Sequence, residues 1–351
     1  MNTVDRAPRA VDAELTAMMD DVFADYRKGD HHVVPGESVE LDRILWRRLD
    51  TLGLVRLTGT EESGGSGASW LEAAELLTAA ARHGVRLPIA EHDLLACWLL
   101  DAIGQTVDDR IRTVHLAPSA SGTAVPVPWA SEADRLVVLQ QTGDVYLVTE
   151  LDTAAVCIRK GTNLIGEPRD TVSVDTASIH GHVVPTELVD ELRRKSAMVR
   201  AIQVCAALDR AVTMSIEHVA SRVQFGRALS KFQAVQNLIA DAAAEAALAR
   251  AATDAALLTG VENGWQSRSL DFQIATARSC AGHAASVVTR NAHQVHGAIG
   301  TTREHRLHES TRAALAWRSE FGSLSYWDAQ VANAAVAAGR SRVWALIANG
   351  Q

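Results

Sequence analysis

Cysteine and basic charge are both scarce in this sequence. Its 351 residues include four cysteines, Cys97, Cys157, Cys205 and Cys280, which lie far apart with no CxxC pair. This pattern excludes a zinc ribbon, argues against a disulfide scaffold and fits the reducing cytoplasm. The 34 basic residues are outnumbered by 42 acidic ones, so the net charge is -8. This balance argues against nucleic acid as the main partner, because binding its phosphates needs a basic face.

Long apolar runs are also missing. Residues 1–30 carry scattered charges and lack the basic start and apolar run of a signal peptide. No run of about 18 apolar residues occurs, which predicts that no segment spans a membrane. Hydrophobic residues nevertheless make up 47% of the chain, enough for a large core. We therefore expect a folded, cytoplasmic protein whose length suggests roughly two domains.

The pattern of apolar residues changes twice along the chain. These changes divide the chain into three predicted domains. Residues 1–108 are predicted to be helical because apolar residues recur three and four apart. Ser69 and Glu72 have the spacing of a capping box at the start of one helix. The helices expected in this domain cover residues 11–26, 41–52, 71–83 and 94–103.

The second predicted domain, residues 109–190, is a small β domain rich in proline. The apolar runs 136–139 and 145–148, separated by a turn-like stretch, predict a hairpin. The third domain, residues 191–351, returns to a helical period and is rich in alanine, which favours close packing of helices in an antiparallel bundle. Further short strands are expected at 156–158, 172–174 and 182–184, and four long helices at 196–221, 232–258, 270–295 and 311–338.

One candidate motif lies between the first two long helices. It reads Arg222-Val-Gln-Phe225-Gly226-Arg227 and is followed by Phe232-Gln233. Gly226 can adopt the positive φ that a break between helices requires. Arg222 at the end of a helix is also favoured by the helix dipole alone, so a simple C-cap is an equally good interpretation.

A second candidate motif lies between the third and fourth long helices. It reads Gln294-Val-His-Gly297-Ala-Ile-Gly300-Thr-Thr. Two glycines three apart let backbone N–H groups approach a ligand, and phosphates favour such loops. A turn that only joins two helices has the same pattern, so this motif is weak by itself.

Taken together, the two motifs resemble the acyl-CoA dehydrogenase family. In that family an R-x-x-F-G segment, a later glutamine and a Q-x-x-G-G-x-G loop hold FAD. Two segments nearer the N-terminus also resemble the family pattern. They are Leu52-Gly53-Leu54 with the segment 61–67, and Val127-Pro128-Trp129-Ala130. The residues that the resemblance assigns to FAD are Arg222, Gln224, Phe225, Phe232, Gln233, Gln294, Val295, His296, Gly297 and Ala298.

The resemblance covers nearly the whole chain and implies a fold, a reaction and partners. The fold is mainly α with a small central β domain and a C-terminal four-helix bundle. The reaction is FAD-dependent α,β-dehydrogenation of an acyl-CoA thioester, in which a carboxylate removes the α proton. An electron-transfer flavoprotein then accepts the electrons. The family also implies an oligomer in which the bundle forms the subunit contact.

The sequence departs from the family pattern at two places. The T-E-P-x-A-G-S-D stretch that surrounds the flavin ring is replaced by Thr113-Val-His-Leu-Ala-Pro118-Ser-Ala-Ser-Gly122, and no W-I-T stretch follows. At the first of the family's two base positions stands Phe321, with Glu320 one residue away, and at the second stands Ser196. A one-residue slip on a helix rotates a side chain by about 100°. Glu320 is our candidate base, against the alternative of a solvated helix-end carboxylate.

These departures leave three hypotheses open. The chain resembles the short partner subunit of α2β2 acyl-CoA dehydrogenases, which would hold the adenosine-pyrophosphate of FAD at a subunit interface without a flavin-ring pocket of its own. That branch acts on bulky thioesters such as steroid side-chain CoA esters. Its partner would be a homologous full-length dehydrogenase subunit. The alternatives are a self-sufficient homo-oligomer with Glu320 as base and a dehydrogenase-like scaffold without redox chemistry.

Histidine, basic and aromatic residues outside the two motifs are further candidates for binding or catalysis. His293, His296, His305 and His308 form two pairs three apart, a spacing that suits a metal. No carboxylate or cysteine partner is evident and loop histidines are common, so we predict no metal site. The basic run Arg193-Arg194-Lys195 is either a solvated charge run or a contact for CoA phosphates. Trp317, Phe321, Tyr326 and Trp327 are expected in the core or at a subunit contact.

Overall fold

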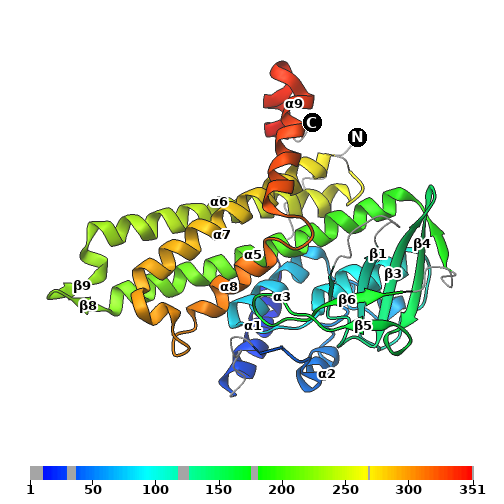
Figure 1. Cartoon of the computed structure of the whole chain (residues 1–351), viewed down its shortest axis with the longest axis horizontal. Helices are drawn as coiled ribbons and strands as arrows, with labels where there is room; N and C mark the ends of the chain where they lie inside the picture. Colours follow the sequence, from blue (N-terminus) through cyan, green and yellow to red (C-terminus); the bar gives the residue numbers. More distant parts are fainter. Residues whose placement is uncertain (1–10, 30–36, 118–125, 175–180, 268, 350–351) are drawn as a thin grey trace.

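A small β domain lies against one end of a long helical bundle in the computed structural model of the chain (Figure 1). The structure describes residues 11–29, 37–117, 126–174, 181–267 and 269–349. This architecture is the predicted one, mainly α with a central β domain. Within the described ranges, no helix combines the length and the apolar character that crossing a membrane requires.

The N-terminal helices begin where the sequence supplies caps. Asp42 accepts from the N–H groups of the first turn of its helix, and Ser69 and Glu72 form the predicted capping box. The helix expected over residues 94–103 is shorter in the structure. It follows a fully buried π-helical segment, and the apolar spacing of the sequence did not predict that segment. The elements are α1 (Ala13–Lys28), α2 (Arg43–Thr51), η1 (Glu61–Ser63), α3 (Trp70–His83), η2 (Ala90–Cys97) and α4 (Trp98–Ala102).

The β domain holds two small sheets. The predicted hairpin is confirmed: its strands β3 and β4 pair antiparallel up to Thr142 and Val145, around Gly143 with φ 62°. One sheet has the order β1-β3-β4-β7, with β1 parallel to β3, and the other has the order β2-β6-β5. The strands are β1 (Arg112–Ala117), β2 (Val127–Pro128), β3 (Arg135–Thr142), β4 (Val145–Asp152), β5 (Cys157–Arg159), β6 (Arg169–Ser173) and β7 (His182–Val184), with the short helix η3 (Thr153–Ala155) before β5.

Strand β3 joins the β domain to the helices because both of its faces are buried. Leu136 and Val138 pack with Val127 and Val172 of the second sheet, while Val137 and Leu139 belong to the helical core. Its continuous apolar run is typical of a strand covered on both sides. The β domain therefore cannot shift as a unit without exposing that core.

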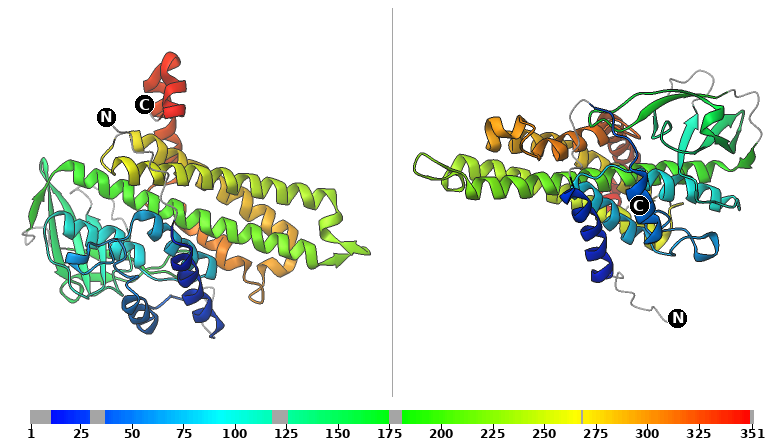
Figure 2. Two further views of the ribbon diagram at one scale, coloured as in Figure 1. Left: turned by 180° about the vertical axis from the view of Figure 1, so that it is seen from behind. Right: turned by 90° about the horizontal axis from the view of Figure 1, so that it is seen from below.

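Alanine packs the centre of the bundle. The predicted C-terminal helix over 311–338 is wrong as a single helix, because the chain breaks between α8 and α9, where Phe321 has φ 53° and Gly322 φ 121°. Beyond that break, α9 stands out from the bundle and changes direction at Gly339 (Figure 2). The helices are α5 (Thr186–Ser221), α6 (Gln233–Asn263), α7 (Ser269–His296), α8 (Leu307–Trp317) and α9 (Leu324–Asn349).

Helix α5 spans the molecule and fixes the distance between its two ends. Its 36 residues correspond to about 54 Å of helix. It begins beside the β domain, ten residues before the predicted start, and ends at a small hairpin (Figures 1 and 2). The hairpin and the nearby short helices are β8 (Val223–Gln224), β9 (Arg227–Ala228), η5 (Leu229–Lys231) and η6 (Gly297–Thr301).

Candidate functional site

The first candidate motif forms the hairpin β8–β9 at the free end of α5. Its two turn residues, Phe225 with φ 51° and Gly226 with φ 76°, both have the left-handed conformation that a tight two-residue hairpin requires. Glycine adopts it freely, whereas phenylalanine does so at a cost of about 1–2 kcal/mol. Phe225 is also 89% exposed. A strained and exposed aromatic side chain at a hairpin tip points to a contact outside this chain.

Polar and aromatic groups surround this hairpin. The Arg227 guanidinium lies 4.0 Å from the centre of the Phe232 ring, and Phe225 meets the same ring edge-on at 6.1 Å. Arg222 is exposed, and no described carboxylate pairs with its guanidinium. Helix α6 starts at Gln233, and no described side chain caps its N-terminus. The hairpin end thus offers a free cation and free backbone donors.

The second candidate motif is the turn at the end of α7. Gly297 has φ 62°, and a Cβ there would meet no atom within 4 Å, so the turn is open toward solvent. A Cβ on Gly300 would lie 2.8 Å from Cβ of His296, which explains glycine at that position by packing. Gln294 and Ala298 are exposed, whereas Val295 and His296 are buried.

The two motifs lie at the same end of the bundle. His218, one turn before Arg222, stacks on His296, with ring centres 4.4 Å apart. The side chain of Asn291 donates to the carbonyl oxygen of Leu238 at 3.0 Å, which ties α7 to the first turns of α6. A positive side chain, an uncapped helix N-terminus and a glycine turn are therefore brought together. Such a set can hold an anion such as a diphosphate.

A cavity of about 650 Å³ lies at the opposite end, between the β domain and the corner of α8 and α9. Its lining includes Val114 and Leu116 of β1, Ser196 of α5, Phe321 at the corner and Trp327 of α9. Trp129 is buried in the core and does not line the cavity. Part of the stretch that replaces the family's flavin-ring motif, residues 118–122, lies outside the described residues.

Glu320, the candidate base, is held in an ion-pair network beside this cavity. Its Oε1 accepts from Nε of Arg169 at 2.7 Å, and its Oε2 accepts from Nε of Arg200 at 2.7 Å. Asn163 donates a further bond at 3.0 Å. Burial favours the neutral acid, but the two guanidinium groups outweigh it and lower the pKa of Glu320 to about 2. A carboxylate held this way is a weak proton acceptor, which counts against a role as base.

The network continues away from the cavity. Arg200 also pairs with buried Glu91 of the π-helical segment, and Arg169 pairs with Glu167. Glu167 in turn accepts from the indole N–H of Trp317 at 2.9 Å. Local sequence patterns did not reveal Arg169 and Arg200, because both meet Glu320 through long-range contacts. These buried pairs fix the β domain onto α5 and α8.

Neither of the positions to which the family pattern points for a base holds a carboxylate. Phe321 presents a phenyl ring to the cavity, with the guanidinium carbon of Arg200 5.0 Å from its centre. The hydroxyl of Ser196 donates to the carbonyl oxygen of Leu192 at 2.8 Å. The cavity therefore has walls that could receive a ligand but no unpaired acid at these positions.

The basic run Arg193-Arg194-Lys195 near the start of α5 was predicted to be either solvated or a contact for CoA phosphates. Neither description fits all three residues. Arg194 pairs with Asp271 of α7, and Arg193 pairs with Asp190 at the surface. Lys195 is buried, with Nζ 3.7 Å from the centre of the Trp98 ring and 3.1 Å from a carboxylate oxygen of Glu191. Burial lowers the pKa of Lys195 to about 8, although Glu191 opposes this shift. Of the three residues of this basic run, Arg193 is the one that lines the cavity.

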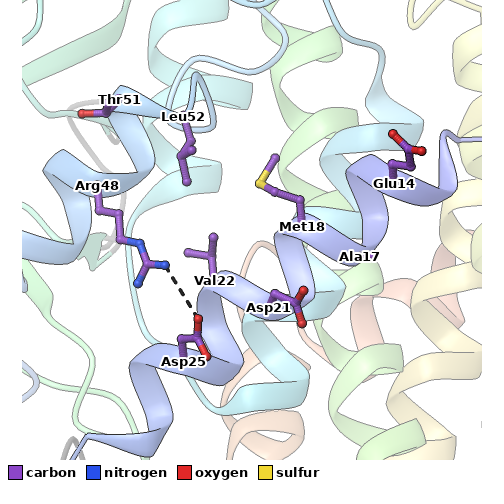
Figure 3. A pocket seen from close by; sticks show the side chains of 9 residues that line it. All are labelled: Glu14, Ala17, Met18, Asp21, Val22, Asp25, Arg48, Thr51 and Leu52. Atoms are coloured by element: carbon purple, nitrogen blue, oxygen red, sulfur yellow. Dashed lines mark ion pairs between the residues drawn. The ribbon is translucent and has the colours of Figure 1, made fainter.

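A second concave region, of about 660 Å³, lies between α1 and α2 (Figure 3). Its apolar side chains include Met18, Val22 and Leu52, and its polar groups are three carboxylates, Arg48 and Thr51. The ion pair between Arg48 and Asp25 crosses it at 4.0 Å, with both side chains about half exposed. Exposed pairs of this kind contribute little energy, and we assign no chemistry to this groove.

The sequence of the chain is similar to that of known proteins. Residues 192–335 match the family model described as the C-terminal domain of acyl-CoA dehydrogenase. Acyl-CoA dehydrogenase FadE27 of Mycobacterium tuberculosis is 26% identical over 78% of this chain and 83% of its own length.

Solved structures show the same fold at low identity. The ChsE4-ChsE5 complex from Mycobacterium tuberculosis contains a chain with a TM-score of 0.77 and 23% identity, which covers 93% of this chain and 97% of that one. A variant of the steroid ACAD Tcur3481-Tcur3483 has a TM-score of 0.80 and 20% identity, covering 93% and 98%. Residues 192–335 thus match the C-terminal domain of the acyl-CoA dehydrogenases, and the chain as a whole is similar to members of that family in sequence and in fold.

Proposed function

We propose that this chain is one subunit of a two-chain, FAD-dependent acyl-CoA dehydrogenase. The relatives and the C-terminal domain match support acyl-CoA dehydrogenase function, and with it a flavin cofactor and an oxidoreductase activity. In our proposal the chain holds the adenosine-pyrophosphate of FAD for a homologous full-length subunit. Electrons then pass to an electron-transfer flavoprotein, as in the family.

The separation of the two ends carries this proposal. Ser196 lines the cavity and Arg222 begins the hairpin, and the 26 residues between them correspond to roughly 39 Å of helix. Figure 2 shows the hairpin at the end of α5 that points away from the β domain, whereas the cavity lies beside that domain. A dinucleotide held by the hairpin belongs with a cavity in a neighbouring subunit.

The hairpin end suits the diphosphate and adenosine of FAD. Arg222 has no described carboxylate partner, α6 has no capping side chain, and the turn at Gly297 is open. Phe225 and Phe232 offer aromatic surface beside these donors. When bound, FAD supplies the hydride acceptor. The residues proposed to hold it remain Arg222, Gln224, Phe225, Phe232, Gln233, Gln294, Val295, His296, Gly297 and Ala298.

The cavity end supports a division of labour between the two subunits. The proton on the α carbon must be removed by a base that is free to accept it. Phe321 and Ser196 cannot do this, and both oxygens of Glu320 are engaged by arginines. We therefore propose that the partner subunit supplies the base. The steroid ACAD of the same fold favours steroid-type thioesters as the substrate class.

Flavin counting tests this proposal. The untagged chain is purified alone and after co-expression with a homologous full-length dehydrogenase subunit, and FAD is counted per chain. We expect FAD and acyl-CoA-dependent dye reduction in the complex only. Arg222→Ala should weaken FAD retention about 10-fold or more, because one charge-assisted contact is lost. Arg47→Ala, at an exposed arginine of α2 that bonds only its own helix, is the control.

Two results would overturn the proposal. Stoichiometric FAD and dye reduction in the chain alone would favour the self-sufficient homo-oligomer with Glu320 as base. Unchanged flavin content in the Arg222→Ala complex would favour a scaffold without a redox role.

A further inference from the structure

Three histidines from separate elements meet at the hairpin end of the bundle. Among the described residues, His218, His296 and His305 place one ring nitrogen each within 4.8 Å of the others. His218 lies on α5, His296 ends α7, and His305 lies in the loop before α8. The ring of His296 is 4.4 Å from that of His218 and 4.6 Å from that of His305, centre to centre. The sequence showed two of the three, and only the fold brings in His218.

His296 is held as a metal-binding histidine is held. Its Nδ1–H donates to the carbonyl oxygen of Ala292 at 2.8 Å, which leaves Nε2 with a free lone pair. That Nε2 is buried and has no hydrogen-bond partner among the described residues, and the whole residue is only 5% exposed. A buried polar nitrogen without a partner is costly. A backbone carbonyl that orients the opposite ring nitrogen is the usual support for a metal-bound histidine.

The surroundings of the three rings disfavour their protonated forms. Burial lowers the pKa of each, and neighbouring cationic or histidine side chains lower it further. The groups that act on the cluster are His293, His308, Arg210 and Arg222, and no described carboxylate is among them. Neutral imidazole is the form that binds a metal.

We propose that His218, His296 and His305 form a three-histidine site for a divalent transition metal of the zinc class. Imidazole ligands suit Zn²⁺ and its neighbours, whereas Mg²⁺ and Ca²⁺ prefer oxygen ligands. Tetrahedral coordination with Zn–N bonds of about 2.0–2.1 Å places the nitrogens about 3.3 Å apart. The rings must therefore close by about 1–1.5 Å from their present separation of up to 4.8 Å. The fourth position stays open for water or an anion.

His305 is the ligand that must adjust most. Its Nδ1 accepts from the backbone N–H of Leu307 at 3.2 Å, and the metal replaces that contact or binds the other nitrogen. His305 lies in a loop, whereas the other two rings lie on long helices. We therefore expect the loop to move toward His218 and His296. The proposed site goes beyond the flavin proposal: it shares His296 with the residues proposed for FAD, but the metal binds through imidazole nitrogens and needs no flavin.

Zinc titration of the full-length, untagged chain tests the site. The chain is stripped with a chelator, and ZnCl2 binding is measured by calorimetry and by metal analysis after desalting. We expect one tight equivalent, with affinity at least about 100-fold weaker in His218→Ala and in His296→Ala. The matched control is His283→Ala, which removes a more exposed histidine of α7 that faces Asp328. Its tight equivalent should be unchanged.

Co²⁺ provides a second measurement. Bound to the same site, it should give a visible spectrum of tetrahedral type that His218→Ala abolishes. His218 is only partly buried, so circular dichroism should show that this variant folds. The proposal is overturned if the wild-type chain binds no tight zinc, or if His218→Ala binds it as tightly as wild type. Because the titration needs no flavin and no partner, these outcomes leave the flavin proposal untouched.

Discussion

The two ends of the bundle use their polar side chains in opposite ways. At the cavity end, Arg169, Arg200 and Glu320 are buried and satisfy one another. At the hairpin end, Arg222 and Gln294 are exposed, and no described side chain pairs with them. A buried charge that is already paired holds the fold together, whereas an exposed, unpaired one is available to a ligand. The chain therefore directs its available binding groups outward.

This contrast shows that a residue at or near a family motif position is not always available for chemistry. Glu320 lies within one residue of a position where the family has its base, yet its surroundings make it part of the fold. The hairpin residues match the family motif, and their surroundings leave them free. Whether a motif residue can act thus depends on what its neighbours have already engaged.

Removing Arg200 should have the largest effect on stability. Arg200→Ala removes the cation that pairs with buried Glu91 and leaves Glu320 with Arg169 as its remaining cation, which costs about 3–5 kcal/mol. Arg193→Ala on the same helix breaks an exposed pair with Asp190 and should cost less than about 1 kcal/mol. Urea unfolding followed by circular dichroism measures both. Equal losses in the two variants would show that the cavity end does not depend on its buried charges.

Acid should weaken the cavity end through Glu320. Its pKa falls from 4.5 to about 2 on folding, so the unfolded chain binds the proton more tightly. The resulting stability is complete above about pH 4.5 and is lost as the pH falls toward 2. Glu320→Gln removes this contribution, and its unfolding midpoint should vary less with pH over this window. Parallel curves for variant and wild type between pH 5 and 3 would contradict the assignment.

The sequence predicted what local patterns determine. Helical spacing, the capping box at Ser69 and the hairpin around Gly143 each depend on residues close together in the chain, and all three are confirmed. The same patterns suggested one helix over 311–338. They did not predict the break at Phe321. Phenylalanine rarely adopts the left-handed conformation, and only the following glycine indicates a break in the sequence.

Long-range contacts are what the sequence could not supply. Arg169 and Arg200 lie 151 and 120 residues from Glu320, so nothing near Glu320 indicates that its oxygens are engaged. His218 lies far from His296 and His305 in the chain, and a histidine at the end of a helix is unremarkable alone. Both the network and the histidine cluster arise only when α5 packs against α7 and α8.

Two glycines of the hairpin end should differ in how they tolerate alanine. Gly300→Ala forces a Cβ within 2.8 Å of His296 and 3.2 Å of Leu307, an overpacking worth about 1–3 kcal/mol. Gly226→Ala has open space and suffers only from its φ of 76°, about 1 kcal/mol. Thermal unfolding of both variants measures the difference. A Gly226→Ala variant that loses more stability than Gly300→Ala would mean that backbone strain outweighs packing here.

The smallest effect on stability, and the sharpest test of the comparison, concerns Phe225. Phe225→Gly removes both the strain of its left-handed conformation and an edge-on contact with Phe232. These changes oppose each other, so the stability of the chain should shift by less than about 1 kcal/mol. Assembly with the homologous subunit should nevertheless weaken, because an 89% exposed aromatic ring is then lost from the outward surface.

Val183→Ala is the control for that variant, since Val183 is 67% exposed on β7 at the other end of the molecule. Size-exclusion chromatography of the co-expressed subunits measures assembly. Equal assembly of wild type, Val183→Ala and Phe225→Gly would mean that the hairpin tip does not reach a partner. If Phe225→Gly loses assembly while its stability stays unchanged, the strain at Phe225 serves a contact with another subunit.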